Sequence, residues 1–81
     1  MNLIWINNAK YLGDYRLALS FSDGAEKIFD AKEYIAKYPA FRVLEDKSAF
    51  SHFALDGWTV SWQNGSLDIA PEYLYETGVP A

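Results

Sequence analysis

The sequence contains no cysteine and a single histidine, His52, among its 81 residues. Without cysteine the chain has no disulfide, no thiolate ligand for zinc and no thiol nucleophile. One histidine and scattered carboxylates also lack the spacing of a metal site, such as two histidines on one helical face. We therefore predict no metal, no cofactor and no enzymatic activity, with His52 a partly exposed helical residue.

The chain also lacks a basic patch and a long hydrophobic run. Seven lysines and arginines, no two of them adjacent, stand against eleven acidic residues, which gives a formal net charge of −4. Nucleic-acid-binding proteins usually present a basic face to the phosphates, so we expect no nucleic-acid partner. The first eight residues have no basic segment, and their apolar run is too short for a signal peptide or membrane span. We expect a cytoplasmic protein that does not contact membranes.

Hydrophobic residues make up 51% of the chain and aromatic residues 17%, with three Trp, six Tyr and five Phe. This length suits one small domain, in which large aromatic side chains help to fill a thin core. We predict a single domain over residues 1–77 and a loose C-terminal tail over residues 78–81. The isolated glycines do not form the Gly-x-Gly-x-x-Gly pattern of a phosphate-binding loop, so we assign them to turns.

Alternating apolar and polar residues predict two β-hairpins. In the first, a strand over residues 15–21 reaches Asp23-Gly24, and a two-residue turn would place Ile28 opposite Leu19. In the second, a strand over residues 58–63 reaches Asn64-Gly65, and the strand that follows would pair Trp62 with Leu67 and Val60 with Ile69. The second ribbon would then have a dry face and a wet face, with the wet side chains being those of Ser61, Gln63, Ser66 and Asp68.

The remaining segments predict one more strand and three short helices. A first strand spans residues 3–9 and turns near residues 12–14. Asp30 is a candidate N-cap for a helix that ends near Tyr38, because Pro39 disfavours helical geometry at the residue before it. Asp46 is a candidate cap for a helix over residues 47–53, and Pro71 begins a helix that runs to about Glu76 and stops at Gly78. The predicted fold is a small two-layer α+β domain of antiparallel hairpins with the order β-β-β-α-α-β-β-α.

The same segments resemble a family of small bacterial proteins, the domain of unknown function 2442. The resemblance rests on residues 17–24 (LALSFSDG) with 28–30 (IFD), on 41–46 (FRVLED) with Phe50, and above all on 60–75 (VSWQNGSLDIAPEYLY). It extends over roughly residues 3–76. It implies a compact α+β domain, found alone or fused to a helix-turn-helix domain. Members that stand alone resemble operon or mobile-element partners, some in arrangements like a toxin–antitoxin pair, and the resemblance implies no activity or catalytic residue.

The remaining candidates for a functional surface are the aromatic side chains and the edges of the sheets. The aromatic residues either fill the core or form an exposed patch that marks a partner surface or ligand groove. We expect a non-enzymatic interaction domain that self-associates, most simply as a dimer, and binds another protein, with an antitoxin-like role as one form of this. The alternative is a small-ligand binder with a Trp/Tyr-lined cleft, in which Asp68, Glu72 and Arg16 would supply the polar groups. The candidate binding residues are Trp58, Trp62, Tyr73, Tyr75, Asp68 and Glu72, and the structural turn residues are Asp23, Gly24, Asn64 and Gly65.

Overall fold

The computed structural model describes residues 3–81. The first two residues of the domain predicted over 1–77 lie outside this range. The described residues form a four-stranded antiparallel sheet in the order β1-β2-β3-β7 and a three-stranded sheet in the order β4-β5-β6. The elements in chain order are β1 (Ile6–Gly13), β2 (Arg16–Phe21), β3 (Glu26–Asp30), α1 (Lys32–Lys37), the 3-10 helix η1 (Pro39–Glu45), α2 (Lys47–Ser51), β4 (Ala54–Leu55), β5 (Val60–Trp62), β6 (Leu67–Asp68), α3 (Pro71–Thr77) and β7 (Val79–Pro80).

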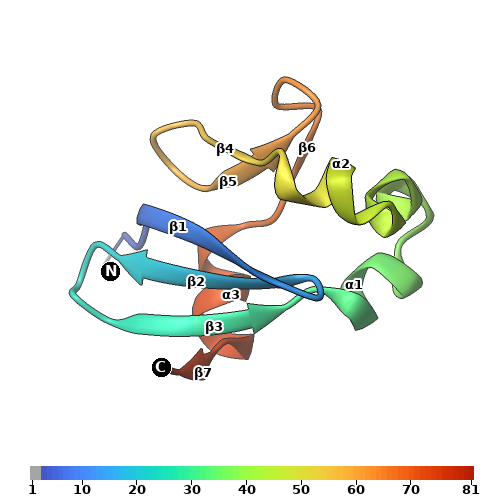
Figure 1. The fold of residues 1–81 in the computed structure, drawn as a ribbon. Coiled ribbons are helices and arrows are strands. Elements are labelled where there is room, and N and C mark those ends of the chain that lie inside the picture. The colour runs from blue at the N-terminus through green and yellow to red at the C-terminus, as the bar shows by residue number, and fades with distance from the viewer. Residues whose placement is uncertain (1–2) are drawn as a thin grey trace.

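The predicted α+β fold is confirmed, and one face of the larger sheet carries the core. Figure 1 shows α3 crossing this sheet, with the three-stranded sheet beyond the β1 edge and α1 and α2 at one end. Phe21 of β2 packs edge-on against Tyr75 of α3, with ring centroids 5.0 Å apart. The buried hydrophobic residues are Ile6, Leu17, Leu19, Phe21, Phe29, Ala31, Ile35, Phe41, Leu44, Phe50, Val60, Trp62, Ile69 and Leu74.

The first hairpin forms with a different register from the predicted one. Leu19 pairs with Lys27, and Ile28 pairs with Ala18 rather than with Leu19. The predicted type I′ turn needs positive φ at both central residues, but only Gly24 (φ +92°) has it here. The loop therefore contains three residues, 22–24, and closes where the Phe21 amide donates to the Ala25 carbonyl. As a result Phe29, not Ile28, lies on the buried face.

The second hairpin has the predicted register, with Trp62 opposite Leu67 and Ser61 opposite Asp68. Asn64 (φ 57°) and Gly65 (φ +88°) both adopt the left-handed conformation that an Asn-Gly turn supplies. The predicted wet face is wrong at one position, because Ser61 is only 3% exposed. Strand β4, which the sequence did not indicate, pairs along β5 and covers it.

The C-terminal segment is not the loose tail predicted for residues 78–81. Val79 and Pro80 of β7 pair with Ile28 and Lys27 of β3, and the Ala81 amide donates to the Glu26 carbonyl at 3.0 Å. The outer edge of β3 would otherwise present unpaired backbone groups. Proline is compatible with this position because an edge strand leaves one side unpaired.

Two of the three predicted helices, α2 and α3, begin at their predicted start signals. The Asp46 side chain accepts a hydrogen bond from the Ser48 amide and caps α2, although this helix ends two residues earlier than predicted, at Ser51. Ala31 rather than Asp30 is the N-cap residue of α1. Asp30 still contributes, because its carboxylate accepts from the Lys32 amide at 3.0 Å. The first strand begins and ends later than predicted, spanning residues 6–13.

Candidate functional site

Trp62 is a core residue and not an open binding surface. Its side chain is 2% exposed and stacks on Phe50 with ring centroids 5.4 Å apart. The indole Nε1–H donates to the Phe50 carbonyl oxygen at 2.8 Å. A buried indole that is stacked and hydrogen-bonded in this way fixes α2 against β5.

Trp58, in contrast, is 41% exposed and lies beside Trp5, which is 40% exposed. The two indoles stack with ring centroids 6.5 Å apart and an interplanar angle of 25°. We call them the tryptophan pair. The Ile6 amide donates to the Trp58 carbonyl at 2.9 Å and so joins the start of β1 to the loop before β5.

The carboxylate of Asp56 shapes the loop that holds Trp58. Its Oδ1 accepts hydrogen bonds from the Thr59 amide at 2.8 Å and the Trp58 amide at 2.9 Å. These two bonds, with the Thr59 bond the larger cause, hold the pKa of the Asp56 carboxyl below its usual value. The Trp58 indole is thus presented by a hydrogen-bonded turn.

Tyr73 and Tyr75 lie on different sides of α3. Tyr73 is 39% exposed and meets Tyr34 of α1, with ring centroids 5.3 Å apart. Tyr75 donates its hydroxyl proton to Asp23 at 2.7 Å, and the Lys27 ammonium lies 3.9 Å from the centre of the Tyr75 ring. Residues two apart on an α-helix point about 200° away from each other, which separates these two tyrosines.

The six predicted binding residues therefore do not form one site. Asp68 of β6 and Glu72 of α3 are both exposed. Both lie in the part of the chain that leads into Tyr73, while Trp58 belongs to the tryptophan pair and Trp62 to the core. Sequence analysis did not single out Tyr34, whose half-buried ring becomes part of this surface through its contact with Tyr73 of α3.

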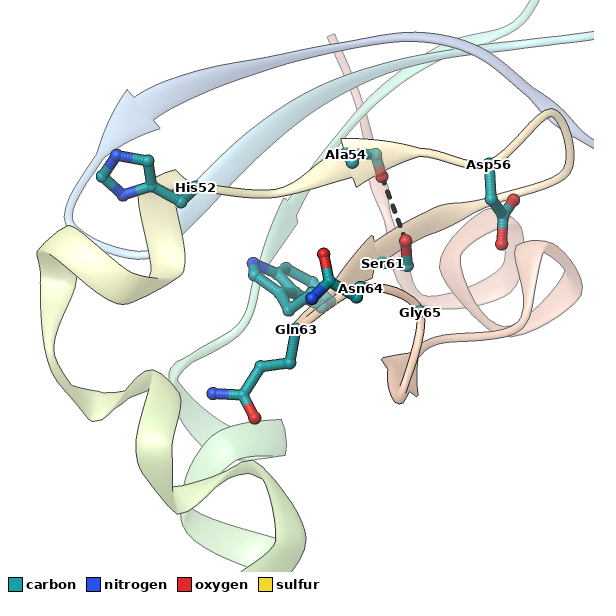
Figure 2. A pocket seen from close by; sticks show the side chains of 8 residues that line it. His52, Ala54, Asp56, Ser61, Gln63, Asn64 and Gly65 are labelled. Atoms are coloured by element: carbon teal, nitrogen blue, oxygen red, sulfur yellow. Dashed lines mark hydrogen bonds between the residues drawn. The ribbon is translucent and has the colours of Figure 1, made fainter.

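A hollow of about 490 Å³ lies on the outer side of the β4–β5 hairpin. Figure 2 shows its polar side chains, with His52 and Asp56 at opposite ends of β4. Tyrosine is not among its lining residues, so it differs from the predicted Trp/Tyr-lined cleft. Its lining residues are His52, Ala54, Asp56, Ser61, Trp62, Gln63, Asn64 and Gly65.

Three polar side chains around this hollow, those of His52, Ser61 and Asp56, are engaged in local hydrogen bonds. Nδ1 of His52 lies 2.6 Å from the Ser48 carbonyl oxygen, which accepts its proton. The Ser61 hydroxyl donates to the Ala54 carbonyl at 3.5 Å, as the dashed line in Figure 2 marks. A Ser-His-carboxylate triad requires these three side chains in one hydrogen-bonded series. Ser61, His52 and Asp56 are not arranged in that way.

Residues 6–80 match the model of a family described as "Protein of unknown function (DUF2442)". The chain belongs to the DUF2442 family. The match begins at the first residue of β1 and ends at the last residue of β7. No curated protein and no solved structure matches the chain.

The description of the DUF2442 family names no activity or ligand. The arrangement of the side chains is therefore what bears on function. Within residues 3–81, no group of three or more His, Asp or Glu side chains is placed to hold a metal ion. None of the helices in the same range is both long enough and apolar enough to cross a bilayer. The surface features that the DUF2442 fold presents are the tryptophan pair, the hollow beside β4 and the contact between Tyr34 and Tyr73.

Proposed function

We propose that this chain is a non-enzymatic protein-interaction domain of the bacterial cytoplasm that self-associates and binds a protein partner. The tryptophan pair carries the proposal. Two stacked indoles, 40% and 41% exposed, leave large apolar surfaces open to water. Exposed apolar patches mark interaction sites, and tryptophan is among the residues that dominate binding energy at interfaces.

The position of the pair beside β1 favours self-association. Within residues 3–81, β1 pairs with β2 alone, so one edge of this eight-residue strand carries no β-ladder. The hydrogen bond from Ile6 to Trp58 joins the tryptophan pair to the beginning of this edge. Unpaired strand edges invite pairing with a second copy, but the three-stranded sheet lies beyond this edge and β4 contacts β1, so the self-association we propose rests mainly on burial of the adjoining tryptophan pair.

The chemistry of the chain also favours binding over catalysis. It has no cysteine, and Nδ1 of its single histidine is used by the Ser48 carbonyl. The formal charge of −4 suits a basic partner such as a toxin, in keeping with the antitoxin-like arrangement that the family resemblance implies.

Sedimentation velocity with Trp58→Ala tests the role of the tryptophan pair. We expect the wild type to form dimers at high micromolar concentration. The variant should weaken dimerisation by about 30-fold, because a central interface tryptophan contributes about 2 kcal/mol or more. Val43→Ala, which trims another exposed apolar side chain, is the matched control and should leave the dimer intact. A strictly monomeric wild type at this concentration would disprove self-association.

Binding to a second protein has a separate test. The purified product of the neighbouring gene is mixed with the chain at low salt, because exposed charge–charge attraction is screened within about 10 Å at 0.1 M salt. A stable complex at low salt supports the proposal. The lack of a complex at low salt would argue strongly against the antitoxin-like role.

The hollow beside β4 favours a second candidate, a small-ligand-binding protein. Its volume of about 490 Å³ is within the range of ligand sites, and the amides of Gln63 and Asn64 line it. A thermal-shift screen of metabolite classes tests this function, and Gln63→Ala is the matched variant. A ligand that raises the melting temperature of the wild type more than that of the variant supports it, and no shift with any class refutes it.

A further inference from the structure

The negative charge of this protein is concentrated in its C-terminal part. Residues 1–47 contain seven acidic and seven basic residues, and no lysine or arginine follows Lys47. The whole formal charge of −4 therefore comes from four acidic residues in residues 48–81. One of them, Asp56, uses its carboxylate to cap the turn before β5. The other three lie on β6 and α3: Asp68, Glu72 and Glu76.

These three carboxylates lie in the same part of the chain as an exposed aromatic residue, Tyr73. The rings of Tyr73 and Tyr34 meet at 5.3 Å and 61°, and Tyr73 is 39% exposed. Glu72 precedes Tyr73 on α3, and Glu76 follows it by three residues, a spacing that makes side chains neighbours on a helix. Asp68 lies near enough to Tyr34 to contribute to the raised pKa of its phenol, of which burial is the largest cause. We call these five residues the acidic tyrosine face.

Other tyrosine rings of this chain already have a lysine beside them. The Lys27 ammonium lies 3.9 Å from the Tyr75 ring centre, and the ammonium groups of two more lysines lie 5.5 Å and 5.6 Å from Tyr38 and Tyr15. Within residues 3–81, no such cation lies over Tyr73. Tyr73 is 39% exposed, has carboxylates near it in the sequence and has no basic residue on its own helix.

We propose that the acidic tyrosine face binds a basic segment of a protein partner, with an arginine side chain of that segment lying on the Tyr73 ring. The guanidinium group is planar, stacks on aromatic faces and forms hydrogen bonds with carboxylates, so it matches both components of this surface. Glu76, three residues after Tyr73, and Glu72, the residue before it, would supply the carboxylates. This inference rests on the proposed function, because it names the chemistry of the partner that the interaction domain accepts.

An NMR titration of the isotope-labelled full chain with hexa-arginine at low salt tests the inference. We expect the largest shifts at Tyr73, Tyr34 and Asp68, and no binding of hexa-glutamate. Tyr73→Ala should weaken hexa-arginine binding by about 2- to 5-fold, the effect of one exposed cation–π contact. Tyr73→Phe keeps the π face and should bind like the wild type, which separates the role of the ring from that of the hydroxyl.

The charge contribution has its own matched pair of variants. Glu72→Gln with Glu76→Gln should weaken hexa-arginine binding, whereas Glu26→Gln with Glu45→Gln removes the same charge from the balanced part of the chain and should weaken it less. Equal weakening by the two double variants would indicate a general charge effect and overturn the proposal. So would unchanged binding by Tyr73→Ala, or shifts centred on other residues.

Trp58→Ala separates this inference from the proposed function. It should bind hexa-arginine like the wild type, because the tryptophan pair is a different surface. Loss of dimers in this variant together with no hexa-arginine binding by the wild type would overturn the inference and leave the proposed function standing. The opposite outcome is also distinguishable. If the wild type binds hexa-arginine at Tyr73 but neither dimerises nor binds the neighbouring gene product, the proposed self-association is overturned instead.

Discussion

Replacing Trp62 with phenylalanine tests whether this tryptophan belongs to the core. Its ring is 2% exposed and stacks on Phe50, and its Nε1–H donates to the Phe50 carbonyl at 2.8 Å. Phenylalanine retains an aromatic ring in this position but removes the second ring and the hydrogen-bond donor. Trp62→Phe therefore isolates what the indole adds to the stability of the fold.

Two losses determine the magnitude. The Phe50 carbonyl is left without its donor in a buried place, which costs about 1–3 kcal/mol. The missing ring removes about 40 Å² of buried apolar surface, or about 1 kcal/mol. We therefore expect Trp62→Phe to lower the free energy of unfolding by about 2–4 kcal/mol. A chain of this length has a total of about 4–12 kcal/mol, so the loss corresponds to a fall in Tm of roughly 10–30 °C.

Urea unfolding followed by circular dichroism measures this loss, with Trp58→Phe as the matched control. Trp58 is 41% exposed and its indole nitrogen donates to no group among residues 3–81, so its replacement should cost less than about 0.5 kcal/mol. The dependence on urea concentration should be the same for the wild type and both variants, since all three expose similar surface on unfolding. Equal losses for the two substitutions would refute the assignment of Trp62 to the core.

Three further predictions concern turns and titrating groups. Tyr75→Phe should raise the pKa of Asp23 toward 3.8, seen in a carboxyl NMR titration, because the Tyr75 hydroxyl is the largest cause that lowers it. Gly65→Ala should destabilise the fold by about 1–2 kcal/mol in urea unfolding, because alanine is strained at φ +88°. A steric clash does not contribute, since no atom lies within 4 Å of the added Cβ. Asp56 has a lowered pKa in the folded state, so its stabilisation is present above 3.8 and is lost as pH falls through the lowered value. Asp56→Asn should therefore show a smaller fall in Tm than the wild type in that acidic window, and an identical fall would contradict this linkage.

The sequence predicted local structure best where one residue type determines a backbone conformation. Asn64-Gly65 indicated a tight turn, and both residues have positive φ, with Trp62 opposite Leu67 as predicted. Asp46 caps α2, and Pro71 begins α3, for equally local reasons. These signals act within a few residues and do not depend on the rest of the chain.

Several predictions failed because the outcome depended on distant contacts. Asp23-Gly24 is compatible with either a two-residue or a three-residue loop. The two-residue loop would pair Ile28 with Leu19, whereas the three-residue loop that forms pairs it with Ala18. Strand β7 forms at Val79–Pro80 because the edge of β3 is available, although these residues have no strand pattern of their own. Ser61 is buried because β4 pairs with β5, which the alternation of side chains cannot indicate.

The candidate binding residues failed as one set for a related reason. Their aromatic side chains are close in sequence, but a helix directs Tyr73 and Tyr75 to different partners, Tyr34 and Asp23. Side-chain direction within α3 is fixed by helical geometry, whereas the partner on each side depends on how α1 and the first hairpin pack against it. The concentration of negative charge after Lys47 does not depend on packing and is visible in the sequence alone. Combined with the exposed Tyr73 ring, it makes the α1–α3 surface, rather than Trp62, the place where a basic partner is expected to bind.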